Sequence, residues 1–223
     1  MKPNNRNKKK VIVVGKGILA IRIADWFKKS KDYKLLFVVP VIPEPSWTAS
    51  FVKWAKKNNV SFVKSGHYKD IPNVKKPGWK IDLVFSVFYD KIIENWFIRK
   101  CQKILNIHNG PLPKYRGVSP INWALKNKEK EHGVTIHKII AKVDAGPIVT
   151  QLRYSIHPEF DEVKDVYNRA LKYGFLLFKQ TMPILDKIKP YNQDDSLATY
   201  YSKEQKEDLG ERRDFTREKP KGN

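Results

Sequence analysis

The chain has 223 residues, which is enough for one α/β domain with a substantial core but not for two full domains. A single cysteine excludes a disulfide framework, and no His-Glu-x-x-His pattern or cysteine cluster predicts a metal site. The net charge of +21 is typical of nucleic-acid-binding proteins, but the lysines are spread along the whole chain, a pattern that favours a solvated surface or attraction of an anionic partner.

The first half of the chain alternates short apolar runs with stretches of helical periodicity. Expected strands cover residues 11–14, 35–41, 60–63 and 82–87, and expected helices begin near residue 18 and, behind a cap at Ser46, at residues 47–57. Continuous apolar strands that alternate with amphipathic helices are typical of a parallel sheet. We therefore predict an α/β fold with a Rossmann-like, mostly parallel sheet and helices on both faces.

The second half predicts helices at 91–100 and 119–126, with Pro120 in the first turn of the latter. Strands are expected at 104–107, 134–140 and 148–156, the last antiparallel to its neighbour because the connection is short. Asp161 is expected to cap a long helix over 163–186. These elements make 1–186 the predicted catalytic domain, and 187–223 a short C-terminal hairpin or tail in which 191–201 forms a hairpin or an extended arm and 210–223 is partly disordered.

No apolar run approaches the roughly 18 residues that a membrane span requires. The apolar run at 11–14 is also too short for the core of a signal peptide. We therefore expect a soluble, cytoplasmic protein that does not bind membranes.

Gly15 and Gly17 follow the first expected strand in the pattern of a dinucleotide-binding turn. Such sites carry an acidic residue at the end of the second strand, whereas this strand ends in Pro40-Val-Ile-Pro43. We therefore interpret the two glycines as turn residues and do not predict an NAD site.

The densest cluster of polar side chains with catalytic potential lies at 106–117, which reads Asn-Ile-His-Asn-Gly-Pro-Leu-Pro-Lys-Tyr-Arg-Gly. Asn106 and His108 end an apolar run, so on a strand both side chains leave the same face. Gly133-Val-Thr-Ile-His137 and Asp144-Ala-Gly146 follow. An amide, an imidazole and a carboxylate are thereby placed where one reaction can use all three.

These three blocks, in this order and spacing, resemble the signature of the formyltetrahydrofolate-dependent formyltransferases. The sequence of residues 106–124 is most similar to that of the enzymes that N-formylate amino sugars carried on a nucleoside diphosphate, such as dTDP-4-amino-4,6-dideoxyglucose. The resemblance implies that Asn106, His108 and Asp144 are catalytic, that N10-formyltetrahydrofolate is the formyl donor, and that no metal takes part. Asn106 would donate to the developing oxyanion, and His108 would take the proton of the amine. Asp144 would hold the imidazole in the right tautomer and stabilise its protonated form, or it would accept a proton through water.

Backbone groups of two loops hold the folate in the enzymes that this chain resembles. The corresponding positions here are Ser86, Phe88, Tyr89, Asp90 and Lys91 in one loop, and Ala141 and Val143 in the other. Substrate contacts are expected from Asn109, Tyr115, Arg116, Tyr200 and Tyr201. Arg116 is a candidate for the diphosphate or for a surface ion pair, and the two tyrosines are candidates for stacking on a base or for a dimer interface. His137, beside the site, is expected to orient or pack.

The expected function is formylation of a nucleotide-linked amino sugar for a surface polysaccharide such as an O-antigen, by a homodimer. Methionyl-tRNA and glycinamide ribonucleotide are the alternative acceptors. The tRNA enzymes carry a C-terminal barrel-like domain that the residues after the long helix are too few to form. A basic nucleic-acid-binding module without activity is the alternative from another class; it predicts strongly salt-dependent binding of RNA or DNA.

Overall fold

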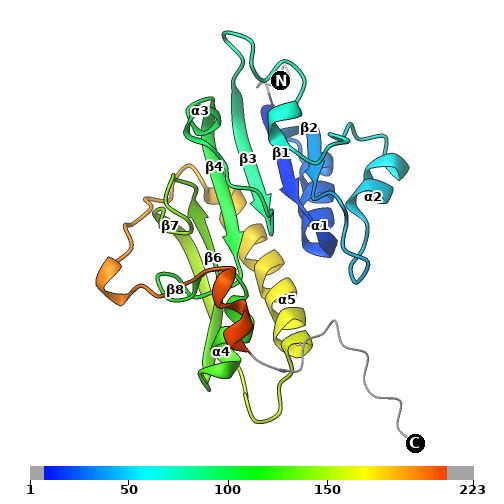
Figure 1. Cartoon of the computed structure of the whole chain (residues 1–223). Helices are drawn as coiled ribbons and strands as arrows, with labels where there is room; N and C mark the ends of the chain where they lie inside the picture. Colours follow the sequence, from blue (N-terminus) through cyan, green and yellow to red (C-terminus); the bar gives the residue numbers. More distant parts are fainter. Residues whose placement is uncertain (1–7, 210–223) are drawn as a thin grey trace, which may run out of the picture. The chain divides into compact units, whose positions relative to one another are not determined.

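The structure is a computed structural model that describes residues 8–209 (Figure 1). The expectation of partial disorder at 210–223 lies outside the described residues. The chain folds into two compact units, and the boundary between them falls between Asn106 and Ile107. No helix within 8–209 is both long and apolar enough to cross a membrane.

The first unit is built on parallel strands. β1 (Lys9–Gly15) pairs in parallel with β2 (Tyr33–Pro40) on one side and with β3 (Ile81–Val87) on the other. The inner strands are almost wholly buried, which explains why their sequences are continuous apolar runs. Helix α1 (Gly17–Lys29) packs against β1 and β2. The α/β, mostly parallel, Rossmann-like architecture predicted from the sequence is confirmed.

Gly15 is a glycine because two strands approach closely at this point. A Cβ atom there would lie 2.0 Å from the carbonyl oxygen of Val87 on β3. The turn after β1 thus has a packing reason for its glycine, independent of any dinucleotide.

Three elements of the first unit are shorter than predicted. α2 covers Phe51–Lys57, because its cap is Ser50 instead of Ser46 and because the Glu44 carboxylate accepts from the N–H groups of Phe51 and Val52. The strand expected at 60–63 is reduced to one bridge between Val38 and Phe62, and the helix expected at 91–100 to α3 (Asn95–Ile98). A single turn, η1, covers Tyr68–Asp70.

The second unit is centred on the antiparallel pair β6 (Glu131–Lys138) and β7 (Ile148–Ser155). Helix α5 (Val163–Thr181) packs along both strands, and α4 (Pro120–Lys126) packs against α5 (Figure 1). α5 is shorter than predicted: it continues as the 3-10 turn η2 (Met182–Ile184). Its cap is Glu162 in a capping box with Asp165, while Asp161 pairs instead with Arg169.

Residues 191–209 form an extended arm and not a hairpin. Tyr191 bridges to Ile148, the turn η3 (Asp195–Leu197) follows, and β8 (Tyr200–Tyr201) pairs in parallel with β5 (Arg116–Gly117). The turn η4 (Glu204–Leu209) then packs against α4. A Cβ atom at Gly117 would lie 2.1 Å from the carbonyl oxygen of Tyr201, so this close pairing requires the glycine.

Candidate active site

His108 is the buried imidazole at the end of β4 (Cys101–His108), two residues after Asn106 on the same strand. The ring is 6% exposed, and its Nε2 lies 2.7 Å from the carbonyl oxygen of Tyr115. Because a carbonyl oxygen only accepts, Nε2 must carry the hydrogen in the neutral ring. The nitrogen that can take up a proton is therefore Nδ1.

Asp144 lies where that proton-accepting nitrogen points. Its Oδ2 is 3.4 Å from Nδ1 of His108 and accepts a 3.0 Å hydrogen bond from the backbone N–H of Gly117. Its Oδ1 is 3.4 Å from Nε2 of His137, whose Nδ1 donates to the carbonyl oxygen of Lys138 at 2.9 Å. The carboxylate thus lies within reach of two imidazoles, each with its other nitrogen fixed by a backbone carbonyl.

Burial and charge set the protonation states of this cluster. Burial lowers the pKa of His108, and the charge of Asp144 offsets part of that shift. Burial alone would raise the pKa of Asp144, but His108, His137 and the N–H of Gly117 together hold it below its ordinary range. Near neutral pH Asp144 is therefore a carboxylate, and it faces the unprotonated Nδ1 of a neutral His108. This arrangement suits a base, because the carboxylate stabilises the imidazolium that forms when Nδ1 takes up a proton.

The residues predicted to contact substrate lie around this cluster in the second unit. Tyr115 has a positive φ of 61°, and its hydroxyl donates to Glu129 at 2.7 Å. Asn109 accepts from His132 through its carbonyl oxygen at 2.9 Å, and its buried Oδ1 has no hydrogen-bond partner among residues 8–209. Such a buried acceptor is normally satisfied by water or a ligand.

Arg116 is 3% exposed, and its guanidinium binds side chains of the same protein. Its Nε and Nη2 donate to Oε1 of Gln193 at 3.0 and 2.8 Å, and Nη2 also pairs with Asp195 at 2.7 Å. Of the two roles left open by the sequence, this geometry favours an ion pair within the chain over a diphosphate contact.

The adjacent tyrosines of β8 differ in their surroundings. The Tyr201 ring stacks on Trp123 with centroids 4.2 Å apart, and its hydroxyl accepts from Asn127 at 3.1 Å. Tyr200 is 54% exposed. Of the two, Tyr200 is the ring that a base or a second subunit could cover.

The first predicted folate loop follows β3 in the first unit. Ser86 is buried, Phe88 has a positive φ of 53°, and the hydroxyl of Tyr89 donates to the carbonyl oxygen of Gly66 at 2.8 Å. Asp90 pairs with Lys91 at 3.3 Å. These contacts are made by side chains, whereas the backbone of the loop is the part expected to hold a pterin.

The second predicted loop lies between β6 and β7 in the second unit. Ala141 and Val143 are exposed there, directly before Asp144.

Gln193 and Asp195 were missed by the sequence analysis. Both lie in a polar segment whose residue types give no motif, and only the folded arm brings them to Arg116. His137, which the sequence predicts to orient or pack beside the site, has its Nε2 3.4 Å from Asp144.

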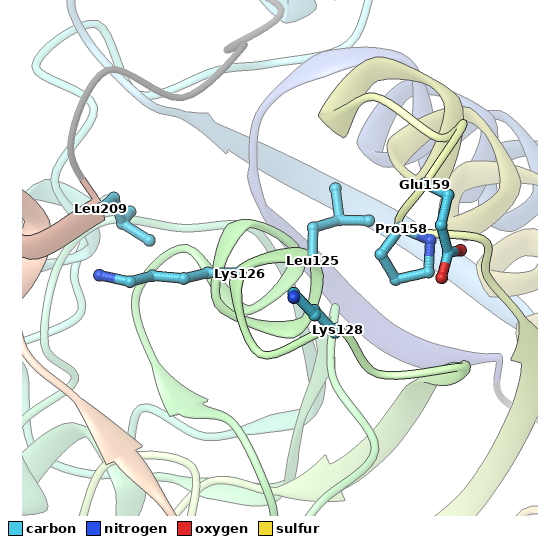
Figure 2. Close-up of a pocket in the computed structure, with 6 residues that line it drawn as sticks. All are labelled: Leu125, Lys126, Lys128, Pro158, Glu159 and Leu209. Carbon is cyan, nitrogen blue, oxygen red and sulfur yellow. The ribbon is translucent and has the colours of Figure 1, made fainter.

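An open cavity of about 440 Å³ lies elsewhere in the second unit (Figure 2). Its lining is formed by the end of α4, the loop after β7 and the end of η4, through Leu125, Lys126, Lys128, Pro158, Glu159 and Leu209. None of the residues predicted for the site lines this cavity, so it is separate from the His108 cluster.

Comparison with known proteins identifies the family. The family model described as formyl transferase matches residues 27–182, which is more than half of the chain. The chain belongs to the formyl transferase family. Asn106, His108 and Asp144 all fall within the matched residues, and the family predicted from the three sequence blocks is confirmed.

Three relatives of this formyl transferase family member are informative. The bifunctional polymyxin resistance protein ArnA of Wigglesworthia glossinidia brevipalpis is 33% identical over 180 residues; the match covers 77% of the chain but only 27% of that longer protein. The sugar 3N-formyl transferase WlaRD, solved with dTDP and 5-N-formyl-THF, has a TM-score of 0.77 and 28% identity over 89% of the chain and 71% of its own. The N-formyltransferase of Helicobacter canadensis, solved with folinic acid and dTDP-3-aminofucose, has a TM-score of 0.75 and 26% identity over 89% and 72%.

Proposed function

We propose that this protein transfers a formyl group from N10-formyltetrahydrofolate to the amino group of a deoxy amino sugar carried on a nucleoside diphosphate. The observation that carries the chemistry is the buried pair of Nδ1 of His108 and Oδ2 of Asp144, which lie 3.4 Å apart. His108 lies two residues after Asn106 on β4. The likeness to two sugar N-formyltransferases, at 28% and 26% identity, supports a nucleotide sugar as acceptor over tRNA or glycinamide ribonucleotide.

The reaction needs a base and an oxyanion donor. The sugar amine attacks the formyl carbon, and its nitrogen loses a proton to Nδ1 of His108. The bond between that carbon and N10 of the folate then breaks, N10 takes up the proton from the imidazolium, and tetrahydrofolate leaves. Asn106 donates an amide N–H to the carbonyl oxygen as it becomes negative, which is typically worth about 3 kcal/mol. Asp144 stabilises the imidazolium that forms.

A transfer assay tests this proposal. The protein is incubated with N10-formyltetrahydrofolate and a panel of dTDP-linked 3-amino and 4-amino sugars, with glycinamide ribonucleotide and methionyl-tRNA as competing acceptors, and release of tetrahydrofolate is followed. We expect turnover with at least one of the nucleotide-linked sugars and none with glycinamide ribonucleotide or methionyl-tRNA. Transfer to tRNA or to glycinamide ribonucleotide alone would reject the sugar assignment, and no transfer to any acceptor would reject the activity.

Three substitutions test the assigned roles. We expect His108→Ala and Asn106→Ala each to lower kcat by about 100-fold or more, and Asp144→Ala by a similar factor. Asn192→Ala, on an exposed side chain of the arm, is the control and should keep the rate of the unchanged protein. A near-normal rate in any of the three catalytic variants would remove that residue from the mechanism.

A homodimer, a cytoplasmic location and a role in polysaccharide synthesis stay predictions from the sequence. Light scattering coupled to gel filtration tests the first of these directly.

A further inference from the structure

The turn that carries Asp144 depends on contacts from outside itself. Asp144 has a positive φ of 49°, and the turn 144–146 belongs to neither a helix nor a strand. A non-glycine residue in this conformation needs support from its surroundings. The direction of the Asp144 carboxylate therefore depends on what holds the turn.

Gln193, at the start of the C-terminal arm, provides that support. Its Nε2 donates to the carbonyl oxygens of Asp144 at 2.8 Å and Gly146 at 2.7 Å. Its Oε1 accepts two hydrogen bonds from the guanidinium of Arg116, at 3.0 and 2.8 Å. All four hydrogen-bonding positions of one side-chain amide are used.

The partners also fix the orientation of this amide. Turning it over would point its N–H groups at the donors of Arg116 and its oxygen at two carbonyl oxygens, so only one orientation forms any of the four bonds. Gln193 thus links two segments that both contact the carboxylate: the turn of Asp144, and the strand whose Gly117 N–H donates to Oδ2 at 3.0 Å.

We propose that Gln193 is a positioning residue for formyl transfer, which sets the distance between Asp144 and His108 by clamping the Asp144 turn to Arg116. The proposal rests on the proposed function only for its kinetic readout. Without the clamp the turn relaxes, Asp144 moves from Nδ1 of His108, and the imidazolium formed in the reaction loses part of its stabilisation. A displacement of about 1 Å in such a constellation costs on the order of 100-fold in rate.

Charged and titratable groups around the turn enter any pH measurement. Asp144 faces His108 from β4 and His137 from β6. Arg116 of β5 and Lys142 both pair with Asp195 of the arm. Removing the neutral amide of Gln193 leaves all of these charges in place, so a change in the titration of His108 reports geometry and not a lost charge.

Gln193→Glu and Gln193→Ala test the proposal, with exposed Asn192→Ala as the matched control. Glutamate keeps the size of the side chain and can still accept from Arg116, but it cannot donate to the two carbonyl oxygens. We expect both Gln193 variants to lower kcat by about 10- to 100-fold with KM for the folate changed by less than about twofold. A rate for Gln193→Glu equal to that of the unchanged protein would overturn the proposal.

NMR titration of the imidazoles gives a second readout that needs no turnover. The charge of Asp144 raises the pKa of His108, so moving the carboxylate away should lower that pKa in Gln193→Ala, which changes no charge, and not in Asn192→Ala. An unchanged His108 titration in Gln193→Ala overturns the proposal. If the unchanged protein transfers no formyl group, the proposed function fails while the titration still decides whether Gln193 positions Asp144.

Discussion

The Oδ1 atom of Asp144 lies 3.4 Å from Nε2 of His137, so the carboxylate has a second imidazole beside it in addition to that of His108. The rings of His108 and His137 are 6.4 Å apart and nearly perpendicular. His137 is 2% exposed, and its Nδ1 is taken by a backbone carbonyl. Its position therefore fits a residue that orients Asp144 and not one that reaches the substrate.

His137→Leu should lower kcat about 10-fold, well short of the effect of His108→Ala. The reason is that the carboxylate loses one of the groups that hold its direction but keeps the N–H of Gly117 and the imidazole of His108 beside it. Steady-state kinetics of the two variants measure the difference. A loss as large as that of His108→Ala would show that His137 acts directly in the proton transfer.

The activity should have an acidic limb with a midpoint below the ordinary histidine pKa of about 6.5, because burial lowers the pKa of His108. The base works when unprotonated, so kcat/KM falls as pH falls through that pKa. In Asp144→Asn the midpoint should move further down, since the negative charge that raises the pKa is gone. Profiles of kcat/KM against pH for both proteins check this, and an upward displacement in Asp144→Asn would contradict it.

His132 should make the protein less stable in mild acid. Burial lowers its pKa to about 4, whereas an unfolded histidine titrates near 6.5. Between these values the unfolded chain binds the extra proton, so the free energy of unfolding falls as pH falls, by at most about 1.4 kcal/mol per pH unit. Urea denaturation of His132→Gln across this window should show a flatter dependence of the free energy of unfolding on pH, and a dependence as steep as that of the unchanged protein would contradict this assignment.

Substitutions of the two tyrosines of β8 should have different effects, one on the free energy of unfolding and the other on substrate binding. Tyr201→Ala loses a stack on Trp123 and a hydrogen bond from Asn127, so we expect a loss of about 1–2 kcal/mol in the free energy of unfolding. Tyr200→Ala, at an exposed ring, should change it by less than about 0.5 kcal/mol.

If the Tyr200 ring stacks on the base of the nucleotide sugar, Tyr200→Ala should also raise KM for that substrate about 10-fold, as base stacking is worth about 1–3 kcal/mol. Urea titrations and substrate saturation curves distinguish the two residues. Equal loss of stability in both variants would contradict this division.

The strands of the parallel sheet could be predicted well because the pattern that identifies each of them lies within its own few residues. Continuous apolar runs identify β1, β2 and β3, since buried parallel strands need apolar side chains on both faces. The start of α2 was predicted wrongly because the contacts that determine it are not local in the sequence. Its decisive cap includes the carboxylate of Glu44, which lies seven residues before Phe51 on the far side of Pro45, and no local pattern ties that residue to the N–H groups of Phe51 and Val52.

The candidate site divides in the same way. His108 and Asn106 could be paired from their spacing on one strand, and the family resemblance supplied Asp144. Gln193 and Asp195 could not be found, because their roles depend on an arm that returns to Arg116 from nearly eighty residues away. Polar side chains in an irregular segment show their partners only when the chain is folded.

The parallel pairing of β5 with β8 also has a consequence for synthesis of the protein. Residues 116–117 leave the ribosome long before residues 200–201, so the backbone of Arg116 and Gly117 must wait for its partner strand. Until then the turn of Asp144 also lacks Gln193. A nascent chain that already contains all three proposed catalytic residues therefore still lacks the contacts that align them, and this site is completed among the last steps of folding.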